Sequence, residues 1–142
     1  MKLVKLVILF VFLSACNTKA EVSITEAWVR ANAPGQTVGA AYMTLESAQD
    51  STLVSVETAV AGSVEIHSMT MDNGVMKMRM LDELVLKAGK SERLAPGGFH
   101  LMLFDLKKPL NSGGNITFKL SFKDKTNKIS IQNVVLPIKE AN

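Results

Sequence analysis

The sequence predicts a single all-β domain with the architecture of a sandwich or barrel. Short segments of alternating apolar and polar residues recur from residue 22 to residue 136, and no long stretch follows the period of a helix. Turn-forming residues separate these segments, as at Pro34-Gly35, Asn73-Gly74 and Gly113-Gly114. Short strands at this spacing are typical of β-sandwiches and barrels, and 142 residues leave room for one domain.

The first fifteen residues are expected to be a secretory signal peptide. Lys2 and Lys5 make its start positive, residues 6–13 (LVILFVFL) are all apolar, and small residues precede Cys16. The apolar run is too short to cross a bilayer as a stable helix. The residues Leu13-Ser14-Ala15-Cys16 also resemble the lipobox of bacterial lipoproteins, which implies cleavage before Cys16 and acylation of that residue. The alternative is an ordinary signal peptide with a cysteine near its end by chance.

This interpretation divides the chain into three parts. Residues 1–15 are the signal peptide, residues 16–22 a lipid-anchored tether and residues 23–138 the folded β-domain. The protein is therefore expected in the periplasm or another extracytoplasmic space, attached to the membrane through Cys16.

Composition and charge exclude several classes of function. The chain has sixteen basic and thirteen acidic side chains, but two lysines and no acid lie in residues 1–15, so the remainder is close to neutral. Without a basic cluster, nucleic acid is not an expected partner. Cys16 is the only cysteine, and a lipid on it would leave no thiol for catalysis, a disulfide or a thiolate metal site. The chain offers no Ser–His–Asp or paired-carboxylate constellation to nominate, so an enzyme is not expected.

Eight strands are expected, each bounded by turn residues or polar breaks. They cover residues 22–30, 39–46, 52–57, 63–71, 75–81, 99–105, 115–123 and 128–136. The two histidines of the chain fall in the fourth and sixth of these segments.

The fourth and fifth segments are predicted to form a hairpin. Asn73-Gly74 is a strong signal for a type I′ turn, in which both central residues take positive φ. This turn sets the register and places three pairs of side chains opposite each other: Met71 and Met76, Met69 and Met78, and His67 and Met80. Because side chains alternate between faces along a strand, all six share one face with Glu65.

The second histidine lies in the segment Phe99-His100-Leu101-Met102-Leu103. His100 and Met102 are two residues apart in a predicted strand and therefore point to the same face. Phe99, Leu101 and Leu103 point to the other face. Both histidines of the chain thus occur in the pattern His-x-Met.

Imidazole and thioether side chains in this combination favour copper(I). Thioether sulfur is a soft neutral ligand, whereas calcium, magnesium and manganese prefer oxygen, and zinc prefers histidine with cysteine or carboxylate. Two other interpretations of the methionines remain open, because methionine also fills irregular cores and forms adaptable protein-binding surfaces. The alternative function is therefore a non-metal lipoprotein that docks a protein through a methionine-rich face, and it predicts that His67 and His100 lie far apart.

The spacing of these residues resembles that of a known family. Ten residues separate His67 from Met78, twenty-one separate Met78 from His100, and one separates His100 from Met102. This pattern, together with the segments at residues 27–30 and 96–103, is similar to the periplasmic copper chaperones of the PCu(A)C type. The resemblance implies a cupredoxin-like Greek-key fold and a copper(I) site whose ligands are His67, Met78, His100 and Met102.

The same resemblance implies a function and partners. The protein would carry one copper(I) ion toward the copper A centre of cytochrome c oxidase, with subunit II of the oxidase or a Sco-type thiol protein as the recipient. The predicted hairpin register differs from the family pattern in one respect, because it puts Met80 rather than Met78 directly opposite His67. Met80 and Met69 are therefore kept as neighbours of the ligands or as an alternative ligand.

Overall fold

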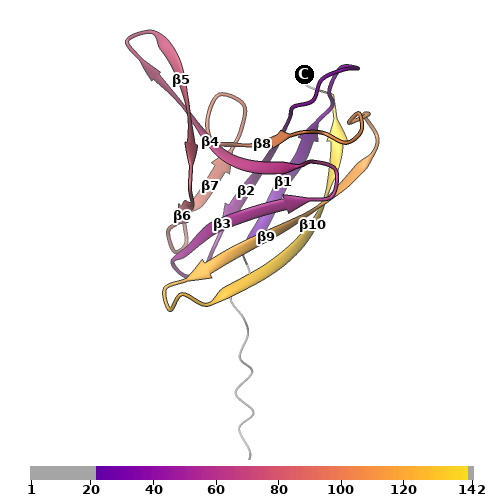
Figure 1. Ribbon diagram of the computed structural model, residues 1–142. Helices are drawn as coiled ribbons and strands as arrows, with labels where there is room; N and C mark the ends of the chain where they lie inside the picture. Colours follow the sequence, from indigo (N-terminus) through magenta and orange to yellow (C-terminus); the bar gives the residue numbers. More distant parts are fainter. Residues whose placement is uncertain (1–21, 141–142) are drawn as a thin grey trace, which may run out of the picture.

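The computed structural model describes residues 22–140, and every regular element within them is a β-strand (Figure 1). The predicted all-β class is therefore confirmed. The ten strands are β1 (Ser23–Arg30), β2 (Gly39–Glu46), β3 (Ser51–Thr58), β4 (Ser63–Asp72), β5 (Val75–Leu81), β6 (Leu84–Leu86), β7 (Ser91–Leu94), β8 (His100–Phe104), β9 (Asn115–Asp124) and β10 (Ile129–Lys139). Within the described range no helix is long and apolar enough to cross a membrane. The predicted signal peptide and Cys16 lie outside that range.

The predicted strands agree with the observed ones to within three residues at every boundary. Two of them, β2 and β5, match at both ends. The short strands β6 and β7 are not evident from the sequence, since three or four residues are too few to establish an alternating pattern. They widen the two layers of the fold, because β6 pairs with β3 and β7 pairs with β2.

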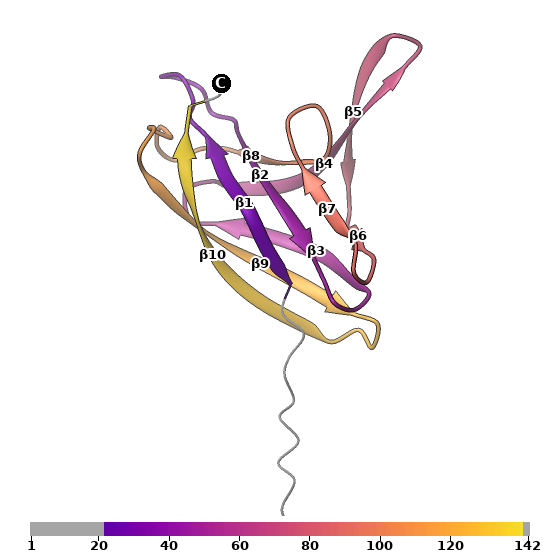
Figure 2. The ribbon, with the colours of Figure 1, turned by 180° about the vertical axis from the view of Figure 1, so that it is seen from behind.

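The strands form one continuous sheet that folds over itself into two layers (Figures 1 and 2). Its order is β5-β4-β8-β2-β1-β10-β9-β3-β6, and β7 pairs with β2 beside this path. The layers join where β1 and β10 run parallel over two residue pairs, Val29 with Ile138 and Arg30 with Lys139. Most neighbours in this order are not neighbours in the sequence, as expected for a Greek key. The sheet stays open between β5 and β6, which makes the fold a sandwich rather than a closed barrel.

One apolar core lies between the layers, and β8 contributes to it with every second residue. Leu101 and Leu103 have no exposed surface and pack in the same cluster as Leu45 of β2. Because side chains alternate along a strand, this inward packing turns His100 and Met102 to the opposite face of β8. The core therefore determines the side of the sheet on which these two residues lie.

The hairpin of β4 and β5 extends beyond the body of the sandwich (Figures 1 and 2). Asn73 and Gly74 have φ angles of 48° and 78°, as the predicted type I′ turn requires. The predicted register is confirmed, with Met71 opposite Met76, Met69 opposite Met78 and His67 opposite Met80. β8 pairs with β4 only from Ser63 to His67, so the rest of the hairpin continues past the edge of β8.

We expect Leu101→Ala to lower the free energy of unfolding by about 2–5 kcal/mol, because it leaves a cavity in the core beneath β8. Denaturant-induced unfolding followed by circular dichroism would measure the loss. Val85→Ala is the matched control, since 49% of Val85 is exposed and its truncation should cost less than about 1 kcal/mol. Equal losses in the two variants would contradict the assignment of Leu101 to the core.

Candidate metal centre

The two histidines lie side by side on neighbouring strands. His67 of β4 and His100 of β8 are directly paired in the sheet, with ring centroids 5.7 Å apart and ring planes inclined by 49°. Two imidazoles that bind one ion through nitrogens about 2 Å from it have centroids roughly 6 Å apart or less. The observed separation therefore suits a shared ion. The alternative function predicts distant histidines, and the structure does not have that arrangement.

His100 is almost fully buried and is held by the loop that precedes β8. Only 4% of its surface is exposed, and its Nδ1 lies 2.9 Å from the carbonyl oxygen of Gly98. A carbonyl oxygen can only accept, so Nδ1 carries the ring proton and Nε2 keeps the lone pair in the neutral ring. The φ angle of 85° at Gly97 and a hydrogen bond from the Ala95 N–H to the Phe99 carbonyl shape this loop. The loop thus selects Nε2 as the nitrogen of His100 that can bind a metal.

A carboxylate selects the opposite tautomer in His67, with the proton on Nε2 instead of Nδ1. The Nε2 atom of His67 lies 2.8 Å from Oε2 of Glu65, which is two residues earlier on the same face of β4. The carboxylate accepts this hydrogen bond, so Nε2 carries the proton and Nδ1 keeps the lone pair in the neutral ring. Nδ1 is buried and has no hydrogen-bond partner within residues 22–140. Buried acceptors without a partner are uncommon and costly, and a bound metal ion would satisfy this one.

Two methionines occupy sheet positions next to the two histidines. Met80 of β5 lies directly opposite His67, so Met80, His67 and His100 form one row across three strands. Met102 of β8 lies opposite Glu65, in the row beside it. All of these residues share the face of the sheet that the core leaves free, because directly opposed residues in antiparallel strands point the same way.

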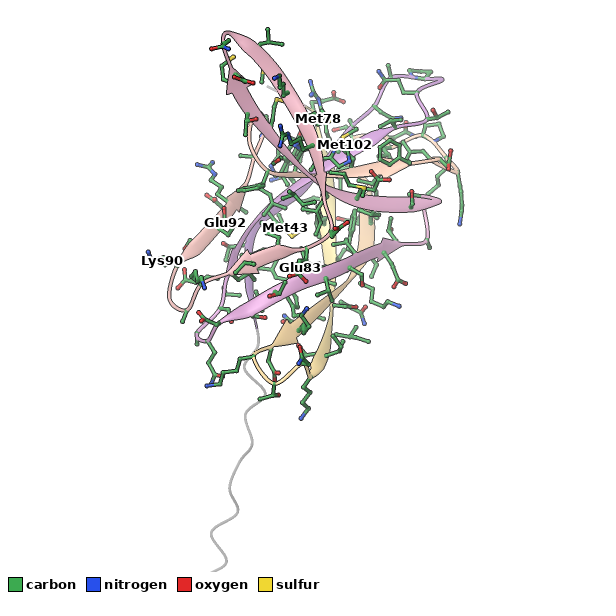
Figure 3. The ribbon with its side chains drawn as sticks, turned by 60° about the vertical axis from the view of Figure 1, so that its left-hand side comes forward. Met43, Met78, Glu83, Lys90, Glu92 and Met102 are labelled. Carbon is green, nitrogen blue, oxygen red and sulfur yellow. The ribbon has the colours of Figure 1, made fainter. Side chains whose placement is uncertain are left out.

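Met78 lies farther out along the hairpin than His67, and Figure 3 labels its side chain together with that of Met102 of β8. It pairs with Met69, two positions beyond the pair of His67 and Met80, and therefore approaches His67 along a diagonal. The exposed fraction is 48% for Met78 and 56% for Met80. Core filling, one interpretation of the methionines, does not describe these two residues. It does describe Met43, which is 1% exposed and lies inside the sandwich.

Two neighbours of His67 are not evident from the sequence. Glu65 is expected on the same face, but its hydrogen bond to His67 depends on side-chain conformation. The ring centroid of Phe104 is 6.1 Å from that of His67. Phe104 follows His100 and Met102 at a spacing of two and therefore shares their face of β8. This spacing is the sequence signal that could reveal the contact. Within the described residues, no group of three or more His, Cys, Asp or Glu side chains could hold a metal ion. The other candidate donors next to the imidazoles are the methionine thioethers.

The matching family and one relative in sequence carry lipoprotein names. Residues 22–135 match the LpqE-like family, whose description is "Putative lipoprotein LpqE-like". The chain is also 31% identical over 120 residues to "Putative lipoprotein Lxx21020" of Leifsonia xyli subsp. xyli, a match that covers 84% of this chain and 70% of that protein.

Two solved structures of copper proteins are similar to this one. The solution structure of CuI-DR1885 from Deinococcus radiodurans is 30% identical, with a TM-score of 0.65, over 88% of this chain and 83% of that one. The copper-bound PCuAC domain from PmoF2 has a TM-score of 0.68 over 84% of this chain and 93% of that one. Its identity is 22%, so this second likeness concerns the fold alone. The predicted cupredoxin-like fold is confirmed.

We expect the two imidazoles of the metal-free protein to carry their protons on different nitrogens, Nε2 in His67 and Nδ1 in His100. Imidazole nitrogen-15 chemical shifts would measure both assignments. In Glu65→Leu the proton of His67 should distribute over both nitrogens, because its acceptor is gone. Glu65→Gln keeps an acceptor oxygen and should preserve the original pattern, with His100 as the internal control. The same tautomer in both rings would be incompatible with these hydrogen bonds.

Proposed function

The chain belongs to the LpqE-like family, and we propose that it is an extracytoplasmic metallochaperone for copper(I). It binds one copper(I) ion and transfers it to a partner protein. The observation that carries the proposal is the pairing of His67 with His100, with the buried Nδ1 of His67 left without a partner. The 30% identity to a protein solved with copper(I) supports the choice of ion.

The proposed ligands are Nδ1 of His67, Nε2 of His100 and the sulfur atoms of Met78 and Met102. All four are neutral, so a monovalent ion leaves only a small net charge in the partly buried site. Glu65 acts from outside the ligand set by fixing the ring of His67, as carboxylates commonly do for metal-binding histidines. Met80 is the alternative to Met78, because it stands directly opposite His67.

Release of copper follows from the unequal exposure of the ligands. Met78 is about half exposed, whereas His100 is almost fully buried. An incoming thiolate can therefore displace the outer thioether first, while the imidazoles still hold the ion. Thiolate is an anionic soft ligand and binds copper(I) more strongly than a neutral thioether, so the ion moves toward a thiol-containing acceptor. Family resemblance supports subunit II of cytochrome c oxidase or a Sco-type thiol protein as that acceptor.

The location is part of the same proposal. Residues 1–15 would be removed as a signal peptide, and a lipid on Cys16 would anchor the protein to the membrane. Residues 16–22 would tether the domain of residues 23–138 on the extracytoplasmic side, in the periplasm. The lipoprotein names of the family and of the Leifsonia relative support this arrangement.

We expect His67→Ala and His100→Ala each to weaken copper(I) binding by at least about a hundredfold, since losing a ligand should exceed the ~10–100-fold effect of losing an outer partner. Anaerobic competition with a chromophoric copper(I) chelator would measure the affinity. Val85→Ala, at an exposed position on β6, serves as the control, and circular dichroism would verify folding. Unchanged affinity in both histidine variants would remove the proposed site.

Met78 and Met80 can be separated by the same titration. Leucine has nearly the volume of methionine but no sulfur, so Met78→Leu and Met80→Leu test ligation with little change in packing. We expect the larger loss of copper(I) affinity in Met78→Leu. A larger loss in Met80→Leu would instead make Met80 the ligand, in agreement with its position opposite His67.

A further inference from the structure

Four methionines near the tip of the β4–β5 hairpin form a group that reaches beyond the two histidines. We call Met69, Met71, Met76 and Met78 the methionine tetrad. They occupy two successive pairs, Met69 with Met78 and Met71 with Met76, on the face that also carries His67. Of the four, the proposed site uses only Met78.

The turn brings the opposed members of the tetrad close together. In a two-residue type I′ hairpin the pair that closes the turn, here Asp72 and Val75, is hydrogen-bonded, and the pairs then alternate along the ladder. Both pairs of the tetrad therefore fall at non-hydrogen-bonded positions, where opposite Cα atoms are only about 4.5 Å apart. Successive pairs are about 6.8 Å apart along the strand, a distance that flexible methionine side chains can bridge. The four sulfur atoms can converge on one point.

Three members of the tetrad are exposed, and Met69 is half-buried. The exposed fraction is 66% for Met71, 54% for Met76 and 48% for Met78. β8 reaches only as far as His67 along β4, so no strand among residues 22–140 pairs with β4 beside the tip. A core role cannot explain large apolar side chains at these positions.

The charged residues of the hairpin nearest the tetrad lie on its opposite face, and Glu65, the carboxylate on the tetrad's own face, is hydrogen-bonded to His67. Lys77 and Arg79 of β5 alternate with the methionines and therefore point to the opposite face. Asp72, the carboxylate nearest the turn, is paired with Lys77. Neutral thioethers without oxygen donors suit a soft monovalent cation and are poor ligands for hard divalent ions.

We propose that the methionine tetrad is a second, weaker copper(I) site composed of thioethers alone. The proposal rests on the proposed function in taking copper(I) as the ion that the protein carries. Met69, Met71 and Met76 provide three sulfur ligands while Met78 serves the histidine site, and Met78 links the two sites. Copper(I) can then pass between the hairpin tip and the histidines by exchange of neutral ligands, with no change in its oxidation state and no proton released.

The test is a titration of the purified protein, carrying carbon-13 in its methionine methyl groups, with copper(I) supplied as its acetonitrile complex without oxygen. The first equivalent should shift the methyl signal of Met102. The second should shift those of Met71 and Met76. A second equivalent that leaves both of these signals unmoved would overturn the proposal.

Variants separate the two sites. The double variant Met71→Leu/Met76→Leu should bind one equivalent instead of two, with unchanged affinity for the first, and continued binding of two would refute the tetrad. Val75→Ala, on the opposite face of the same hairpin, should still bind two. In His67→Ala/His100→Ala the tight site should be lost while copper(I) still shifts the signals of Met71 and Met76. Failure of the histidine site therefore remains distinguishable from failure of the tetrad.

Discussion

The pairing of β4 with β8 is the constraint on which the candidate centre depends. It joins histidines thirty-three positions apart in the sequence and sets His67 opposite His100. A slip of one residue in this pairing would turn one of the rings to the other face of the sheet. The core opposes such a slip, because the adjacent pair, Ile66 and Leu101, is 5% and 0% exposed. Burial on one face of the sheet thus aligns the nitrogen donors on the other.

The hairpin could be predicted residue by residue, whereas the β4–β8 pairing could not. Asn73-Gly74 is a local signal, and a two-residue turn between alternating strands leaves one register. Three strands, β5, β6 and β7, separate β8 from β4 in the sequence, and no local pattern specifies that β8 returns to β4. The shared His-x-Met pattern and the family spacing were the only indications that the rings meet. The hydrogen bond between Glu65 and His67 could not be predicted from the pattern or the spacing, since alternation determines the face of a side chain but not its conformation.

The imidazoles and the methionines of the candidate centre lie in different environments. The rings of His67 and His100 are each held by a hydrogen bond, to Glu65 and to the Gly98 carbonyl. The methionines of the hairpin are about half exposed and have three rotatable bonds each. One part of the centre is therefore fixed before any ion arrives, and the other can rearrange around an ion or an incoming ligand.

The position of β5 at one end of the sheet has a consequence for solubility. Its outer backbone groups have no partner strand within the described residues, and exposed edges of this kind tend to recruit the edges of other copies. β5 carries two cations, Lys77 and Arg79, and Lys77 is paired with Asp72 of β4. Repulsion between two such edges opposes growth into intermolecular sheets. Charge on the edge strand thus disfavours pairing between the hairpins of two copies.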